Sequence, residues 1–297
     1  MDIKVNKLVL LMKKLLLLFM ICILVLTGCT TPQTAQIAAS TMPVAEFTAY
    51  ICKGTDLTVS QLITEEISCL HDYSVQVSQM RLVENAEVIV ISGAGLEDFL
   101  HDALEGKDTP IEAAHGIELI CPAEEHHHED GHHHHEGDPH LWLSPIRAKA
   151  MAQNIYDGLC RNYPEYCQIF SKNLDKLLSD LDALQAYGES QLATLSTRQL
   201  ITFHDGFAYF AEAFDLTIVK AVEEESGAEA SASELIELIQ LVHLYNLPAI
   251  FTETNGADAA ARIIAAETGV SLYALDMAMS GDSYFEAMYH NIDTIKE

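Results

Sequence analysis

Short apolar runs rich in Val and Ile alternate along this chain with longer segments of helical periodicity. Such alternation is typical of β/α units, in which helices connect parallel strands and cover the sheet. At roughly 150 residues per domain, 297 residues leave room for two such assemblies. The content of 49% hydrophobic residues excludes the collagen-like and disordered classes, and 7 Cys are too few for a disulfide scaffold. We therefore predict an α/β fold with two β/α lobes and parallel-rich sheets.

The two sets of units lie at 36–165 and 197–297. In the first set the pattern predicts strands at Gln36–Ala39, Leu57–Leu62, Val88–Ile91 and Glu118–Cys121, and helices at Val44–Cys52, Val77–Glu84 and Leu96–Leu104. In the second set it predicts strands at Gln199–Phe203, Thr217–Ala221, Ala249–Thr252 and Leu272–Leu275, and helices at Gly206–Phe214, Ala232–Tyr245, Asp258–Thr268 and Ser283–Ile295.

The segment between the two sets, 166–196, has the pattern of one long amphipathic helix. Its Leu residues recur at spacings of three, four and seven, at Leu174, Leu177, Leu178, Leu181 and Leu184. The pattern lasts too few repeats for a coiled coil. We predict a single helix that links the lobes and limits their relative motion.

The N-terminus has the pattern of an export signal. Four Lys precede an unbroken apolar stretch from Leu15 to Leu26, which is too short to span a bilayer. Leu26-Thr27-Gly28-Cys29 resembles a bacterial lipobox, which implies cleavage after residue 28 and a lipid on Cys29. We expect 1–28 to be a lipoprotein signal peptide and 29–35, which is polar and contains Pro, to be a tether.

The charge of the chain limits its partners. With 16 Lys+Arg against 44 Asp+Glu, the formal charge is −28. A nucleic-acid-binding surface needs clustered cations, so we expect no such partner. An acidic chain attracts cations, although acidic charge alone is weak support for a metal site.

Five cysteines remain in the body of the chain. Export permits disulfides, and Cys160 and Cys167 flank a predicted turn between helices, so this pair is conceivable. Sequence does not fix connectivity, and the default expectation is that Cys52, Cys69, Cys121, Cys160 and Cys167 are free thiols.

A His-rich segment at 124–137 is the most unusual part of the sequence. Seven of the 14 histidines lie in it, interspersed with acids: His126, His127, His128, His132, His133, His134 and His135. Imidazole is a common ligand of zinc, copper and nickel. A specific site needs ligands held by rigid elements, so we predict a loop that collects metal in several arrangements.

Four further residues are candidate ligands of a specific site. His71 follows the second predicted strand, His140 precedes the predicted helix cap Ser144-Pro145, and His204 and Asp276 each end a strand. In parallel sheets, ligands bind outside the carboxyl ends of the strands. Two ligands from each lobe would therefore converge in the cleft between the lobes. Spacing alone does not select these four, because it matches no local zinc motif.

Several motifs resemble those of one family. His71-Asp72-Tyr73, Asp138-Pro139-His140-Leu141-Trp142, His204-Asp205-Gly206-Phe207 and Leu275-Asp276 occur in the order found in the ZnuA/TroA family, the solute-binding lipoproteins of zinc and manganese ABC importers. This resemblance covers nearly the whole chain after Cys29. It implies two β/α lobes, a linking helix, and a metal site between the lobes.

The resemblance also implies a function and a site. His71, His140, His204 and Asp276 would bind Zn²⁺, since three imidazoles and a carboxylate suit tetrahedral zinc; Mn²⁺, which prefers oxygen ligands, is the alternative. Asp276 is the position at which relatives differ, and water can replace it. Glu253, at a strand end, would accept a hydrogen bond from a ligating His or be an ordinary strand-end acid. The expected protein is a monomeric, lipid-anchored, extracytoplasmic receptor that delivers zinc to an ABC permease and catalyses no reaction.

Two other classes remain open from the residues alone. A zinc hydrolase could use three His with Glu253 as the base, although no hydrolase motif occurs. An extracellular zinc buffer or adhesin would need no transporter.

Overall fold

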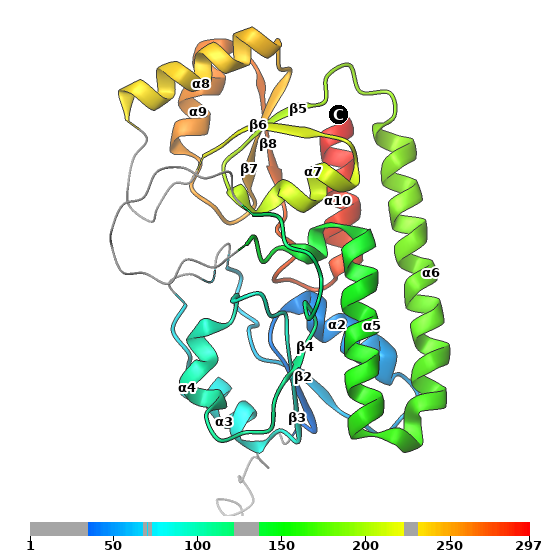
Figure 1. Ribbon diagram of the computed structural model, residues 1–297. Helices are drawn as coiled ribbons and strands as arrows, with labels where there is room; N and C mark the ends of the chain where they lie inside the picture. Colours follow the sequence, from blue (N-terminus) through cyan, green and yellow to red (C-terminus); the bar gives the residue numbers. More distant parts are fainter. Residues whose placement is uncertain (1–34, 68–69, 71–72, 122–136, 223–230) are drawn as a thin grey trace, which may run out of the picture. The chain divides into compact units, whose positions relative to one another are not determined.

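The computed structural model describes residues 35–67, 70, 73–121, 137–222 and 231–297. These residues form two α/β lobes, each built on a four-stranded sheet (Figure 1). The predicted fold class is therefore confirmed. Within the described residues, no helix has the length and apolar character needed to cross a membrane.

The first lobe has a sheet in the order β2-β1-β3-β4, and every pair is parallel. The central strands β1 and β3 are buried throughout, as their continuous apolar sequences require. The strands are β1 (Ile37–Ala39), β2 (Val59–Gln61), β3 (Val88–Ile91) and β4 (Ile111–Glu112), and the helices between them are α2 (Met42–Cys52), α3 (Val77–Asn85), η1 (Asp98–Leu100) and α4 (His101–Leu104).

The prediction of a strand at Glu118–Cys121 is wrong. The fourth strand is Ile111–Glu112, where Ile111 pairs with Val90 and is buried. The backbone of Ile120 instead bonds outside the sheet. Its N–H donates to the Tyr209 hydroxyl (2.9 Å), and its carbonyl accepts from the N–H of Asp138 (2.8 Å). Both backbone polar groups of Ile120 are therefore hydrogen-bonded without a neighbouring strand.

The second lobe repeats the architecture with the order β6-β5-β7-β8, again parallel throughout. The strands β5, β7 and β8 are adjacent, so their carboxyl ends meet at one edge of the sheet. The strands are β5 (Gln199–Thr202), β6 (Thr217–Ala221), β7 (Ala249–Glu253) and β8 (Ser271–Leu275), and the helices are η4 (Asp205–Phe207), α7 (Ala208–Ala213), α8 (Ala232–Tyr245), α9 (Ala259–Thr268) and α10 (Tyr284–Lys296).

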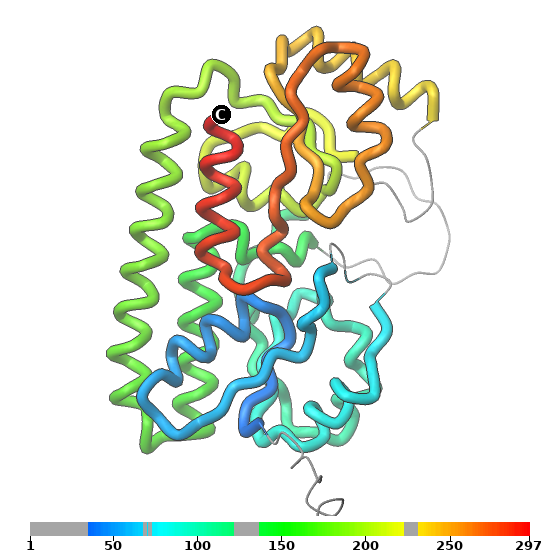
Figure 2. Tube along the Cα trace, turned by 180° about the vertical axis from the view of Figure 1, so that it is seen from behind, coloured from blue at the N-terminus to red at the C-terminus, as the bar shows by residue number. Residues whose placement is uncertain are grey.

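Three segments connect the lobes: η2 (Leu141–Leu143), α5 (Pro145–Asn162), and α6 (Cys167–Leu192), which follows η3 (Pro164–Tyr166). The α6 helix runs beside both lobes (Figures 1 and 2) and packs on α5 and α2 as well as on α10. Its buried face follows the helical period of the sequence and consists of Phe170, Leu174, Leu177, Leu181, Leu184, Gly188 and Leu192.

Two hydrogen bonds fix α6 to both lobes. The Tyr50 hydroxyl of α2 donates to Asp180 (2.6 Å), and the Tyr187 hydroxyl of α6 donates to Asp293 of α10 (2.6 Å). In each pair the two side chains come from different helices, so the bonds add to the apolar packing of α6 against both lobes.

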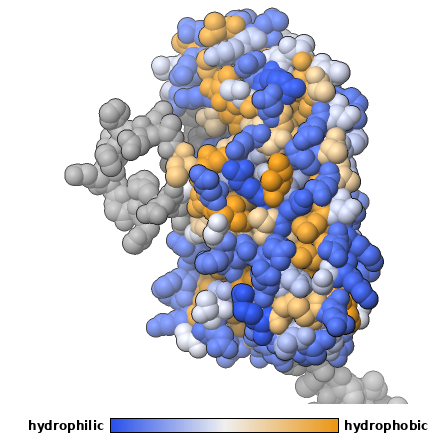
Figure 3. Space-filling view, turned by 45° about the vertical axis from the view of Figure 1, so that its right-hand side comes forward, coloured by the Kyte–Doolittle hydropathy of each residue, from blue (hydrophilic) through white to orange (hydrophobic). Residues whose placement is uncertain are grey.

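The face of the protein drawn in Figure 3 is largely hydrophilic. On the face drawn in Figure 3, hydrophilic residues predominate and divide the apolar ones into separate patches. Much of the surface of any folded protein is apolar, so separate patches of this kind are normal.

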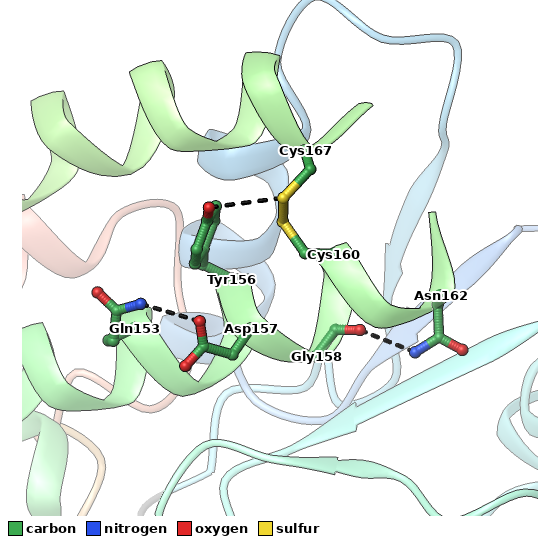
Figure 4. Close-up of a disulfide and its surroundings, with 7 residues drawn as sticks. All are labelled: Gln153, Tyr156, Asp157, Gly158, Cys160, Asn162 and Cys167. Carbon is green, nitrogen blue, oxygen red and sulfur yellow. Dashed lines mark hydrogen bonds between the residues drawn. A yellow bond between two sulfur atoms is a disulfide. The ribbon is translucent and has the colours of Figure 1, made fainter. Parts of the chain in front are cut away.

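Cys160 and Cys167 form a disulfide between α5 and α6 (Figure 4), so the default expectation of free thiols is wrong for this pair. The short turn through η3 brings the two helix ends together, with Cα atoms 5.0 Å apart, within the range that a disulfide spans. Cys52, by contrast, is a buried free thiol, and burial raises its pKa to about 12.

Removing this disulfide is expected to lower stability. The crosslink closes a short loop, and loop-closure entropy for about eight residues corresponds to roughly 2.5 kcal/mol. The double variant C160S/C167S should show a lower urea midpoint than the oxidised wild type, while the exposed substitution C121S should not. Equal midpoints for oxidised protein and C160S/C167S would contradict the expected contribution.

Candidate metal centre

The candidate residues of the second lobe lie at one sheet edge. Glu253 is the last residue of β7, Asp276 immediately follows β8, and His204 comes two residues after β5. His140 lies just before η2, in the connection between the lobes. His71, Cys29 and the seven histidines of 126–135 lie outside the described residues.

The structure brings His140 and His204 together. Their ring centroids are 5.4 Å apart and the ring planes are nearly perpendicular, at 86°. His140 is buried and also packs edge-on against Trp142, with centroids 5.3 Å apart. Two largely buried imidazoles in edge-to-face contact are close enough to share a metal ion.

Asp138 orients the His140 ring. Its Oδ1 accepts the backbone N–H of His140 (2.9 Å) and lies 2.8 Å from ring Nδ1. When Nδ1 carries the proton and donates it to Asp138, Nε2 has the lone pair that can bind a metal. This role of Asp138 was not predicted from the sequence, although an Asp two residues before a His is a usable signal for such a turn.

Glu253 lies beside His204. Its Oε1 is 3.6 Å from His204 Nδ1, which is longer than a hydrogen bond. Burial, together with the nearby charges of Asp276 and Asp205, raises the pKa of Glu253 to about 8. The charges of Asp276 and Asp205 therefore reach Glu253, and a cation nearby would favour the charged form of Glu253.

Asp276 is held by the side chain of Asn291 from α10. The Asn291 amide accepts from the backbone N–H of Asp276 (2.7 Å) and donates to its carbonyl (2.7 Å). Asp276 Oδ1 accepts the backbone N–H of Ala278 (2.7 Å), which turns the chain sharply after β8. Asn291 is completely buried, so this support is rigid.

Further bonds tie the segment around His140 to the second lobe. Trp142 Nε1 donates to the Met277 carbonyl (2.8 Å), and the Tyr284 hydroxyl donates to the Trp142 carbonyl (2.8 Å). The Tyr209 hydroxyl donates to the Asp138 carbonyl (2.7 Å). These contacts place His140 against His204, and sequence reasoning missed all of them because each joins residues far apart in the chain.

The described residues do not by themselves contain a complete set of metal ligands. Outside 68–69, 71–72, 122–136 and the other undescribed ranges, no group of three or more His, Cys, Asp or Glu is placed to hold an ion. The structure places the paired imidazoles of His140 and His204 near the carboxyl groups of Asp205, Glu253 and Asp276. His71 lies outside the described residues.

Two parallel β/α lobes joined by a long helix are the architecture of a solute-binding receptor, and the paired imidazoles favour a metal as the bound solute. A family model described as zinc-uptake complex component A, periplasmic (ZnuA), matches residues 37–297. The chain belongs to this family.

Individual relatives agree with this assignment. The zinc-binding lipoprotein AdcA of Streptococcus pneumoniae serotype 4 is 31% identical over 96% of this chain, and the chain spans 61% of AdcA. The manganese-binding lipoprotein MntA of Halalkalibacterium halodurans is 26% identical over 75% of each chain. A crystal structure of ZnuA superposes with a TM-score of 0.77 at 27% identity and covers 88% of this chain and 98% of its own.

Proposed function

We propose that this protein is an extracytoplasmic receptor that captures Zn²⁺ and delivers it to an ABC import permease. The observation that carries the proposal is the pair of imidazoles, His140 and His204, brought to 5.4 Å from separate segments of a chain of the zinc-uptake family. Receptors of this kind bind and release, so the proposal includes no catalysed reaction.

The proposed ligands are Nε2 of His140 and His204, a carboxylate oxygen of Asp276, and an imidazole nitrogen of His71. The structure supports the first two through their mutual approach and supports Asp276 through its place at the same sheet edge. His71 is proposed because it follows β2, a parallel strand of the first sheet. Three imidazoles and one carboxylate suit tetrahedral zinc.

Manganese is the second candidate cargo. The MntA relative favours it, and the carboxyl groups of Asp205, Glu253 and Asp276 could supply oxygen ligands. The zinc-binding name of the relative with the higher identity, AdcA, supports zinc.

The remaining parts of the chain receive roles in the same proposal. Residues 1–28 direct export, Cys29 carries the lipid, 29–35 form the tether, 36–165 and 197–297 form the lobes, and 166–196 link them. The histidines of 124–137 raise the local supply of metal. The names of the AdcA and MntA relatives, both lipoproteins, support the anchor.

Zinc stoichiometry tests where tight binding resides. Protein starting at Gln33, with and without residues 124–136, should bind one zinc tightly in competition with a chelator. Fluorescence of the single tryptophan, Trp142, reports on the cleft because its ring packs against His140. If tight binding is lost when 124–136 are deleted, the cleft assignment fails and a His-rich metal buffer becomes the better explanation.

A further inference from the structure

Three side chains approach Gly206 closely, at the position that a side chain on residue 206 would occupy. Gly206 is buried in η4, two residues after His204. The point at which a Cβ on Gly206 would lie is 2.4 Å from Met277 Cε, 2.9 Å from His204 Cδ2 and 3.0 Å from His140 Cε1. A side chain here would collide with all three, so only glycine permits this close approach.

The two ring carbons place both imidazoles close to the methionine. Within an imidazole ring, both Cδ2 and Cε1 are bonded to Nε2, the nitrogen proposed to bind the metal. Because all three atoms lie within 3.0 Å of this one point, the methyl group of Met277 is near a ring carbon adjacent to Nε2 in both His140 and His204. An ion bound by both Nε2 atoms would have this apolar group on one side.

Met277 is firmly held in this position. It is 4% exposed and immediately follows the proposed ligand Asp276. Its carbonyl accepts the Trp142 indole N–H, and the next residue, Ala278, has a φ of 51°, which fixes the turn. Trp142, which packs against His140 and donates to Met277, is also buried.

The rest of the site is rich in oxygen atoms. Asp205, Asp276 and Glu253 are near enough for the charges of the first two to affect the third. Mn²⁺ prefers six oxygen ligands in an octahedral arrangement, whereas four-coordinate zinc accepts imidazoles and one carboxylate. Water that entered beside these carboxylates would complete an oxygen-rich shell.

We infer that Met277, which contacts Gly206, sets the metal selectivity of this site. Its side chain excludes water ligands from one side of the ion and so favours four-coordinate zinc over manganese. This inference rests on the proposed function, because it assumes that His140 and His204 bind the ion. Met277 acts here as a specificity-determining residue that occupies space, and its sulfur is not a ligand.

Truncating the side chain tests the inference. In the full chain purified in detergent, M277A should lower the ratio of Zn²⁺ to Mn²⁺ affinity by at least about tenfold, the lower end of the effect of altering a group that supports a metal ligand. Both affinities are measured by chelator competition. One equivalent of Co²⁺ should absorb visible light strongly in the wild type and weakly in M277A, because tetrahedral Co²⁺ absorbs much more than six-coordinate Co²⁺.

Two variants separate selectivity from stability and from sulfur chemistry. M277L keeps an apolar side chain of similar volume and should retain the wild-type ratio and spectrum. M288A removes the side chain of another fully buried methionine, in α10, and should lower the melting temperature while leaving the ratio unchanged.

Each other outcome overturns the inference in a distinguishable way. A wild-type ratio and Co²⁺ spectrum in M277A would show that Met277 does not control coordination. If M277L lost the ratio as M277A does, the sulfur would be responsible, and the space-filling role would be wrong. If H140A in the same assay retained tight zinc, the proposed site itself would fail, and the inference with it.

Discussion

Replacing His140 with alanine is expected to abolish tight zinc binding. The substitution removes one proposed ligand and leaves Asp138 Oδ1 without the ring nitrogen that it now contacts at 2.8 Å. Changing a residue that merely supports a ligand typically costs 10–100-fold in affinity, so loss of a ligand should cost at least about 100-fold. H204A should have a comparable effect, because His204 supplies the second imidazole of the pair. Chelator competition measures both.

The matched control is H115A. His115 has an 82% exposed side chain next to Glu112 and is not one of the proposed ligands, so its removal should leave zinc affinity unchanged. Circular dichroism of the metal-free variants establishes that H140A and H204A fold. One tight zinc site retained in both folded variants would refute the ligand assignment.

The metal-free protein should lose stability as the pH rises towards 8, and E253Q should lose less. The pKa of Glu253 is about 8 in the folded protein and close to its ordinary 4.5 once unfolded. Between these values the folded state holds a proton that the unfolded state has released, so the free energy of unfolding falls as the pH rises through this window. Allowing for partial solvation, the expected fall is on the order of 3 kcal/mol.

Urea unfolding at pH 5.5, 7 and 8.5, with a chelator present, measures this difference. Glutamine does not titrate, so E253Q should gain stability over the wild type as the pH increases, while E267Q, at an exposed position in α9, should follow the wild type. Zinc should oppose the trend, because a nearby cation favours the ionised carboxyl group and stabilises the folded protein. Parallel pH profiles for E253Q and the wild type would contradict the raised pKa.

Local sequence patterns predicted much of the fold. Buried parallel strands such as Val88–Ile91 are continuous apolar runs, and Ser144-Pro145 begins α5 as expected, with Ser144 Oγ accepting from Arg147 N. The long helix follows from its Leu spacing. These features depend on neighbours within one or two turns of the chain.

Features that depend on distant partners were not predictable in the same way. The strand expected at Glu118–Cys121 failed because Tyr209, 89 residues from Ile120, takes its backbone hydrogen bond. Whether Cys160 and Cys167 are bonded or free depends on the geometry of the turn between them, which the sequence alone does not fix. At the site, strand-end logic placed Glu253 and Asp276, but the contact of Met277 with Gly206 exists only in three dimensions.

The attachment of α6 to both lobes has a thermodynamic and kinetic consequence. Tyr50–Asp180 joins the middle of α6 to α2 of the first lobe, and Tyr187–Asp293 joins its C-terminal part to α10 of the second lobe, so α6 holds the two lobes in place with His140 already close to His204. An arriving ion therefore meets a preorganised pair of donors and spends little of its binding free energy on bringing the lobes together. Affinity differences between related complexes lie mostly in dissociation rates, so under the proposed function the release of zinc would require a change at the ligand-bearing segments themselves.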